Sequence, residues 1–238
     1  MIAYHYLNEE HGLDALQKQW LKAGRLFDLN DPADCRPILT NIPDGQSVNE
    51  EEYFKFLYRE IGVLCFCEGI DDPVIWTHYA DSHRGIAIGY DIRRPTHNVL
   101  YQDHRPTIDY VETHRLLKDG QPTNEFLDKV IPEGFRQKAK SWSYEREQRL
   151  FTGLAGLEMV GSNYFYELQP FLTIVQVVLG YRCKLTESDV LRAGRRLHRR
   201  GDLSWIFRAR LKADSFRLDV FNSATQTSLE IPPRTPPA

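Results

Sequence analysis

The sequence predicts a single α+β domain in which mixed, mostly antiparallel sheets are flanked by helices. Short apolar runs typical of strands recur along the chain, and amphipathic segments with helical spacing lie between them. No linker interrupts residues 1–222, and no internal repeat is visible. Residues 223–238 are rich in proline and are expected to form a flexible tail.

The expected strands are short segments of apolar or alternating residues. Residues 174–179 are nearly all apolar, so this strand is expected at the centre of a sheet. The last two strands should form a hairpin around residues 213–215. In chain order the expected strands are residues 3–7, 25–29, 63–67, 85–90, 99–101, 108–111, 142–151, 165–168, 174–179, 205–211 and 216–221.

The expected helices carry apolar residues at helical spacing. Leu13, Leu16 and Leu21 follow this spacing, and Gly24 should end their helix. A later basic helix has Thr186 or Ser188 as its expected N-cap. The remaining expected helices are residues 51–61, 74–80 (a helix or a turn), 123–140 and 187–200.

Composition and charge narrow the class of protein. The net charge is −3, so the overall electrostatic potential of the chain does not attract nucleic acid or an anionic membrane. Positive charge is local, in the arginine-rich stretch 192–200, which either touches phosphates or is a solvated helix face. No signal peptide and no apolar run long enough to span a membrane are visible.

The spacing of the cysteines indicates the cellular compartment of the protein. They have no spacing typical of metal sites, and two of them alternate in an apolar strand, so their thiols should face one side. We expect buried, reduced thiols and therefore a cytoplasmic protein. The four cysteines are Cys35, Cys65, Cys67 and Cys183.

Residues 142–151 carry the most informative cluster. As a strand with period two, this segment places Glu145, Glu147 and Arg149 on one face. Two neighbouring carboxylates repel each other unless a cation or a shared proton lies between them. Such a cluster can hold a hydroxyl, a cation or a developing positive charge. The alternative is an exposed helix with a weak ion pair between Glu145 and Arg149.

A second candidate segment, residues 76–85, gathers many functional groups before a strand. Trp76 and Tyr79 are candidates for stacking on a base or sugar, with a core role for both as the alternative. His78 and His83 lack the spacing of a helical metal pair, so no metal site is expected.

Two further segments hold polar residues near strands. His5 lies between two tyrosines and should face away from them, which favours a structural histidine. Asn30 and Asp31 precede a proline after an expected strand, so a turn is favoured over a ligand contact.

These segments together resemble a bacterial family of uncharacterised proteins, known as a domain of unknown function and often encoded near phage-defence genes. The resemblance spans about residues 3–221, and its most specific motif is Trp-x-Tyr-Glu-x-Glu-x-Arg. One departure is Ala33, where an aromatic residue is expected. The matching segments are Tyr4-His5-Tyr6, Asn30-Asp31-Pro32-Ala33-Asp34, Trp76-Thr77-His78-Tyr79-Ala80 through Gly85, Lys138 through Arg149, and Val177 through Arg182.

A more distant resemblance is to ADP-ribosyltransferases, especially toxins that modify nucleic acids and RNA 2′-phosphotransferases. The strand with His5, the helix with Leu13 and Leu16, and the turn at Gly24 look like the opening of those enzymes. The toxin-type enzymes also carry a glutamate on a strand, which Glu147 or Glu145 matches. The resemblance implies an NAD-dependent transferase of a defence or toxin system, with a nucleic-acid or protein acceptor and an antitoxin or defence partner.

The same resemblance implies roles for the candidate residues. Glu147 would stabilise the developing positive charge on the ribose, and Glu145 would orient it or act as base for the acceptor, beside Arg149. The expected NAD-binding residues are His5 and Tyr6 at the first strand, Arg25 or Arg84 at the pyrophosphate, Asn30, Trp76 and Tyr79.

Two other classes of protein stay open. The first is a non-catalytic module that binds a nucleotide or peptide through Trp76 and Tyr79. The second is a nuclease that holds Mg²⁺ with carboxylates, although no lysine is expected beside them. Its candidate ligands are Asp31, Asp34, Glu145 and Glu147.

Overall fold

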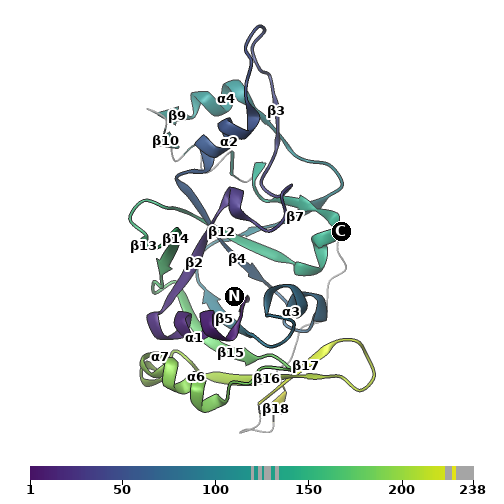
Figure 1. Cartoon of the computed structure of the whole chain (residues 1–238), viewed down its shortest axis with the longest axis vertical. Coiled ribbons are helices and arrows are strands. Elements are labelled where there is room, and N and C mark those ends of the chain that lie inside the picture. The colour runs from purple at the N-terminus through teal and green to yellow at the C-terminus, as the bar shows by residue number, and fades with distance from the viewer. Residues whose placement is uncertain (119–120, 123–124, 126–129, 132–133, 223–226, 229–238) are drawn as a thin grey trace.

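The computed structural model describes residues 1–118, 121–122, 125, 130–131, 134–222 and 227–228, and it confirms a single α+β domain with a mostly antiparallel sheet (Figure 1). The expected proline-rich tail lies almost entirely outside the described residues. The helical segments are α1 (Glu9–Lys18), η1 (Leu26–Asp28), α2 (Glu50–Tyr58), α3 (Pro73–Tyr79), α4 (Tyr110–Arg115), η2 (Lys140–Glu145), α6 (Glu187–Ala193) and α7 (Arg195–Arg200), where η denotes a 3₁₀ helix.

Twelve of the described strands form one large sheet. These strands are β1 (Ile2–Leu7), β2 (Trp20–Arg25), β4 (Ile61–Cys67), β5 (Ile86–Ile92), β6 (His97–Asn98), β12 (Glu147–Gly153), β13 (Glu158–Val160), β14 (Asn163–Glu167), β15 (Leu172–Leu179), β16 (Trp205–Leu211), β17 (Leu218–Asn222) and β18 (Thr227–Ser228). Their order is β13-β14-β2-β4-β1-β5-β15-β16-β17-β18, and β12 pairs with both β4 and β6.

Three small pairs of strands lie outside the large sheet. They are β3 (Ile38–Thr40) with β8 (Thr107–Asp109), β7 (Leu100–Gln102) with β11 (Gln137–Ala139), and β9 (Leu117–Lys118) with β10 (Gln121–Pro122). As expected, β15 is central and buried, and β16 and β17 form an antiparallel hairpin.

The first helix ends earlier than the sequence suggests. Gln19 adopts a left-handed conformation with φ 57°, and its backbone N–H donates to the carbonyl of Ala15, which closes the helix. The chain then runs directly into β2, which passes through Gly24. The strand expected at residues 25–29 is therefore wrong, because β2 occupies the preceding segment and η1 follows it.

Other differences between the expected and the observed elements come from residues that cap helices. The basic segment 187–200 is two helices broken at Gly194, and Thr186 and Asp189 form the capping box that starts the first of them. Asp109 ends β8 and caps α4, so the strand expected at 108–111 is shorter. The helix expected at 123–140 lies partly outside the described residues, and at its end the strand β11 replaces it.

Two hydrophobic cores cover the two faces of the large sheet, and a third lies beside it. Helices α1, α6 and α7 pack on one face, and α3 packs on the other. Helices α2 and α4 enclose the third core at the far end of the molecule (Figure 1). Strand β4 takes part in all of them, because its alternating side chains point into different cores.

The sheet splits along one edge of β4. Strand β1 pairs with β4 only at Tyr4, and β2 pairs with it only at Gly24 and Arg25. The middle of β4 is thus left between two diverging strands. The Nδ1 atom of His5 reaches across this gap and donates to the carbonyl of Cys65 at 2.8 Å.

Among the described residues, every helix is too short or too polar to cross a membrane.

Candidate functional site

A cavity of about 270 Å³ lies where β1 and β2 diverge from β4. Residues from distant parts of the chain form its walls, so only the folded protein assembles it. Aliphatic and aromatic side chains line most of it, and a cluster of charged groups lies at one end. The charged residues that line it are Lys22, Asp28, Asp34, Lys138, Glu145, Glu147 and Arg149.

Glu145, Glu147 and Arg149 converge on this cavity, but they do not share one strand face. Residues 140–145 form η2, and Arg146 turns the chain in a left-handed conformation with φ 46°. Strand β12 begins only at Glu147. The strand expected over 142–151 is therefore wrong in its first half. The alternative of an exposed helix is also wrong, because all three side chains are buried.

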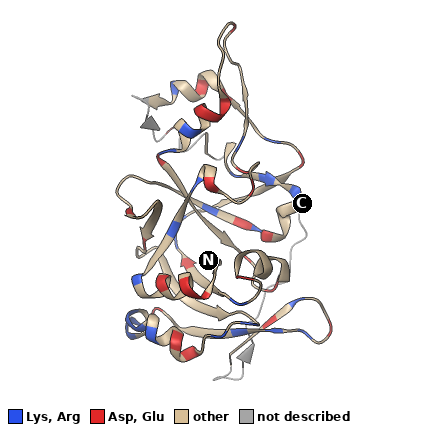
Figure 2. Ribbon diagram, in the orientation of Figure 1, with Lys and Arg blue, Asp and Glu red and all other residues tan. Residues whose placement is uncertain are grey.

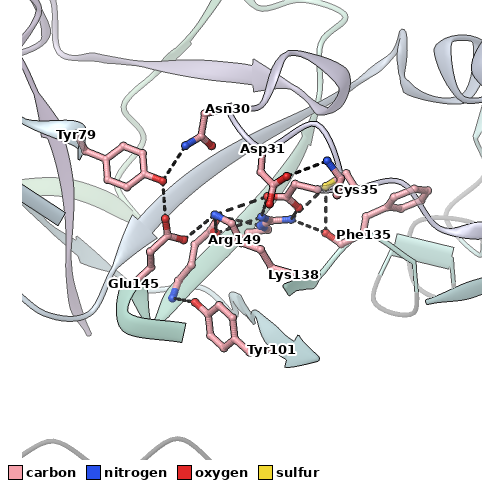
Figure 3. A network of polar contacts seen from close by, with 12 residues as sticks. Asn30, Asp31, Cys35, Tyr79, Tyr101, Phe135, Lys138, Glu145 and Arg149 are labelled. Carbon is pink, nitrogen blue, oxygen red and sulfur yellow. Dashed lines mark hydrogen bonds and ion pairs between the residues drawn. The ribbon is translucent and has the colours of Figure 1, made fainter. Parts of the chain in front are cut away.

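Arg149 is the centre of a buried network of charge-assisted hydrogen bonds (Figure 3). Its guanidinium donates to both oxygens of Asp34, at 3.0 and 2.6 Å, and to both oxygens of Glu147, at 2.8 and 3.1 Å. The NH1 group also donates to the carbonyl of Phe135 at 2.8 Å and contacts the Sγ of Cys35 at 3.1 Å. These contacts hold the guanidinium, which has no exposed surface, in one orientation.

Lys138 links all three carboxylates of the cluster. Its Nζ lies 2.6 Å from Glu145, 3.2 Å from Glu147 and 3.7 Å from Asp34. The Nζ also lies 4.8 Å from the centre of the Trp142 ring, which shields the cluster. The sequence shows no lysine in the usual close relation to these carboxylates, and the fold brings Lys138 to them.

The cluster contains an excess of negative charge. Three carboxylates, from Asp34, Glu145 and Glu147, face two cations, Lys138 and Arg149. All five side chains are buried, so this imbalance is costly unless a proton or a cationic group compensates it.

The two glutamates respond differently to burial. Burial raises the pKa of Glu145, and Lys138 only partly offsets this effect. Burial also opposes ionisation of Glu147, but Arg149 and Lys138 outweigh it and lower its pKa to about 2. Of the two carboxyls, Glu145 is therefore the one that takes up a proton more readily, while Glu147 stays ionised. A divergence of this kind typically separates an acid or base from an electrostatic partner.

Tyr79 connects Glu145 to the open side of the cavity. Its hydroxyl donates to Glu145 at 2.5 Å and accepts from the side chain of Asn30 at 3.0 Å (Figure 3). Burial raises the pKa of Tyr79, so its phenol stays protonated and remains the donor to Glu145. Asn30 is exposed, and so the chain of hydrogen bonds leads from solvent to the buried carboxyl.

His5 and Tyr6 line the same cavity from β1. Burial lowers the pKa of His5, which favours a neutral ring. A carbonyl can only accept, so Nδ1 carries the proton that the Cys65 carbonyl receives, and Nε2 is the acceptor. The Tyr6 hydroxyl donates to the carbonyl of Gly69 at 2.7 Å and is buried.

Three predicted site residues lie outside the cavity. Trp76 has no exposed surface, packs edge-on against Tyr6 and belongs to the core under α3, so it offers no stacking surface. Arg25 forms an ion pair with Asp28 at 2.6 Å. Arg84 is exposed beyond α3, and neither arginine is among the residues that line the cavity.

Several functional residues had no clear signal in the sequence. Lys138 lies in the resembling segment, but nothing in its neighbourhood marks it as the partner of the carboxylates. Tyr101 accepts a hydrogen bond from the backbone N–H of Glu147 at 2.7 Å and so positions the start of β12. Cys65 and Cys67 both line the cavity, so they face one side as their alternation predicts, but they are half-buried and not buried as expected.

Asp31, a ligand in the nuclease alternative, accepts from the backbone N–H of Ala33 at 2.9 Å in the expected turn.

Comparison with known proteins gave no significant match to any family model, curated protein or solved structure.

Proposed function

We propose that this protein is an NAD-dependent ADP-ribosyltransferase whose reaction centre is the cavity at the split of the sheet. The observation that carries the proposal is the buried cluster of three carboxylates and two cations. With Glu145 ionised, the cluster has an excess of one negative charge. Such an excess stabilises the positive charge that develops on a ribose when its bond to nicotinamide breaks.

The proposed reaction breaks the C–N bond between ribose and nicotinamide. Nicotinamide leaves with the bonding electron pair, and an atom of the acceptor forms a new bond to the same ribose carbon. The acceptor loses a proton to the carboxylate of Glu145, whose raised pKa makes it a stronger base than an exposed glutamate. Glu147 keeps Arg149 and Lys138 in position, so the role first expected of Glu147 passes to Glu145.

The cavity has features that suit a nucleotide. Neutral His5 offers an acceptor for a ribose hydroxyl, and Lys22 at the wall is a cation for the pyrophosphate in place of Arg25 or Arg84. Its volume of about 270 Å³ is at the lower end for ligand pockets. It would therefore enclose the nicotinamide and its ribose, and the rest of the dinucleotide would extend out of the mouth.

The resemblance to the bacterial family of unknown function supports a shared site. Its motifs come from distant segments of the chain, yet Asn30, Tyr79, Glu145, Glu147 and Arg149 contribute to one connected network. Motif residues that meet in this way are typical of a binding or catalytic site. We propose that the chain belongs to this family and acts in a defence or toxin system.

A magnesium-dependent nuclease fits the cluster less well. Arg149 engages both oxygens of Asp34 and of Glu147, so a metal ion would have to displace a guanidinium. Cleavage of RNA or DNA that EDTA abolishes would support the nuclease over the transferase.

The test is NAD calorimetry together with a nicotinamide-release assay on two isosteric variants. We expect Glu145→Gln to retain NAD binding and to lose release by at least about 100-fold, because it removes the base. Glu147→Gln should lower both the thermal stability and release, because it loosens Arg149. Glu51→Gln, which removes an exposed carboxylate on α2, is the control and should change neither.

Absence of NAD binding to the wild-type protein would exclude the transferase. Binding without release in the presence of nucleic-acid and protein acceptors would favour the non-catalytic module instead.

A further inference from the structure

Two donors hold the carboxyl of Glu145, one on each oxygen. The Tyr79 hydroxyl donates to Oε1 at 2.5 Å, and the Nζ of Lys138 donates to Oε2 at 2.6 Å. Figure 2 shows the setting of this carboxyl, with acidic and basic residues close together where β12 begins. The proposed base is therefore held on both of its oxygens by other residues of the protein.

Tyr79 is more accessible than the carboxyl that it holds. Glu145 is only 2% exposed, whereas Tyr79 at the end of α3 is half-buried and lines the cavity. The Tyr79 hydroxyl lies between exposed Asn30 and buried Glu145 (Figure 3). A ligand group that enters beside Asn30 therefore meets the phenol before it meets the carboxyl.

The directions of these hydrogen bonds allow the phenol to pass a proton on. An ionised carboxylate only accepts, so the hydrogen of the Tyr79 hydroxyl points to Glu145. The Tyr79 oxygen accepts from the side-chain amide of Asn30 at 3.0 Å. A phenol oxygen has two lone pairs, so one of them can still accept a hydrogen bond from a ligand.

We propose that Tyr79 relays the proton of the ADP-ribosyl acceptor to Glu145. The acceptor contacts the phenol oxygen, and Glu145 takes the proton through the phenol instead of directly. This inference rests on the proposed function and identifies the residue that contacts the acceptor in it. The essential group of Tyr79 is then its hydroxyl and not the face of its ring.

The relay conserves protons and electron pairs. The O–H or N–H bond of the acceptor breaks, and its proton bonds to the Tyr79 oxygen while the phenol's own proton moves to Oε1 of Glu145. The electron pair left on the acceptor forms the bond to the ribose carbon, and nicotinamide leaves with the pair of the broken C–N bond. Because burial keeps the pKa of Tyr79 well above its usual range, the two proton transfers occur together and no phenolate forms.

Tyr79 also influences the pH at which Glu145 ionises. Burial raises the pKa of Glu145, and the hydrogen bonds from Lys138 and Tyr79 lower it, because both donors stabilise the ionised form. Removal of the Tyr79 hydroxyl should therefore raise the pKa of Glu145 further. The other titratable groups around Glu145 stay in place in Tyr79→Phe, and they are Lys138 on β11, Glu147 on β12, Cys67 on β4, Tyr101 on β7, the neighbouring Tyr144, and Asp34 beyond Lys138.

The test compares the full-length wild type with Tyr79→Phe in NAD calorimetry and in nicotinamide release over a range of pH. The acceptors offered are water, RNA, single-stranded DNA and casein. Tyr79→Phe keeps the ring, so NAD binding should persist. Release should fall by at least about ten-fold, and its rise with pH should move to higher pH. In a Glu145→Gln background, Tyr79→Phe should cause almost no further loss, because the relay then has no base to serve.

Tyr110→Phe is the matched control. The Tyr110 hydroxyl likewise accepts from a side-chain amide, that of Gln46 at 2.6 Å, but it belongs to the core that α2 and α4 enclose. This variant should leave release and its pH profile unchanged. Wild-type release by Tyr79→Phe, a loss of release with an unshifted pH profile, or an equal loss in Tyr110→Phe would overturn the relay.

Urea unfolding reports the ionisation of Glu145 without NAD. For the wild type, the difference in free energy of unfolding from Glu145→Gln should fall with pH and level off once Glu145 is ionised in the folded protein. For Tyr79→Phe, the difference from Tyr79→Phe/Glu145→Gln should level off at a higher pH. Levelling at the same pH as in the wild type would contradict the control of Glu145 by Tyr79.

The outcomes separate this inference from the transferase. If the wild type releases nicotinamide and Tyr79→Phe releases it equally well, the relay fails and the transferase stands. If the wild type neither binds NAD nor releases nicotinamide, the transferase fails and the relay fails with it. The unfolding comparison then still decides whether Tyr79 sets the ionisation of Glu145.

Discussion

Arg149 shows how one buried side chain organises the site. Its planar guanidinium bridges two carboxylates. One belongs to Asp34, far away in the sequence, and the other to Glu147 on the same strand as Arg149. A buried arginine is stable only when its donors are satisfied, and here two carboxylates and the Phe135 carbonyl satisfy them. The same contacts fix the position of Glu147 and, through Lys138, of Glu145.

We expect Arg149→Lys to destabilise the protein although it preserves the charge. A lysine cannot contact two carboxylates bidentately, so the free energy of unfolding should fall by about 2–3 kcal/mol. Arg115→Lys is the matched control, because Arg115 contacts Glu112 with the same fork at 2.8 Å on the exposed surface. It should cost less than about 0.5 kcal/mol. Urea unfolding measures both, and equal losses would contradict the structural role of Arg149.

Glu145 should make stability depend on pH. Burial raises its pKa in the folded protein above the ordinary 4.5, so the folded state retains a proton that the unfolded chain has released. The stability that this group contributes is complete below about pH 4.5 and is lost as the pH rises through the folded pKa. Glutamine does not titrate. The free energy of unfolding of wild type, relative to Glu145→Gln, should therefore fall as the pH rises above about 4.5.

Thermal or urea unfolding over that range measures the difference between the two proteins. A constant difference, or one that grows in favour of the wild type, would mean that Glu145 is not the titrating carboxyl.

At the scale of elements, a kink between η2 and β12 brings the two glutamates together. Arg146 occupies this kink with φ 46°, a conformation that glycine adopts freely and β-branched residues avoid. Its buried Nε has no hydrogen-bond partner among the residues that the structure describes. The kink allows Glu145 to approach Lys138 from the 3₁₀ helix while Glu147 approaches it from the strand.

Two substitutions at this position should have opposite effects. Arg146→Gly should maintain or raise the free energy of unfolding, because the left-handed conformation costs a non-glycine residue about 1–2 kcal/mol. Arg146→Val should lower it by a similar amount or more. Chemical denaturation measures the free energy of unfolding of both variants. A valine variant as stable as the glycine variant would contradict the left-handed conformation of residue 146.

At the scale of the whole molecule, β4 joins the cores and the cavity. Leu64 and Phe66 pack into the core under α1, whereas Ile61 and Val63 pack into the core under α2 and α4. Cys65 faces the cavity between them. Because the strand serves both cores, the split of the sheet beside it is held rigidly on either side. The cavity is therefore a feature of the scaffold.

The sequence by itself determined much of the architecture. Apolar runs and helical spacing predict β1, β4, β5, β15, α2 and the final hairpin, because local burial patterns reflect the period of the element. The segment around Glu145, Glu147 and Arg149 also stood out, because paired carboxylates beside an arginine need a special environment. The placement of Cys65 and Cys67 on one side of their strand follows from the same alternation.

The tertiary structure alone decided which distant groups meet. The sequence grouped Asp34 with Glu145 and Glu147 only in the nuclease alternative, and nothing local to Lys138 indicates that it joins them. Their contacts with Glu147 and Arg149 arise from the packing of separate segments. The same packing removed Trp76 from the candidate site by burying it. Periodicity records which side of an element is buried, but it does not record which partner lies opposite, and the charges of this site depend on that partner.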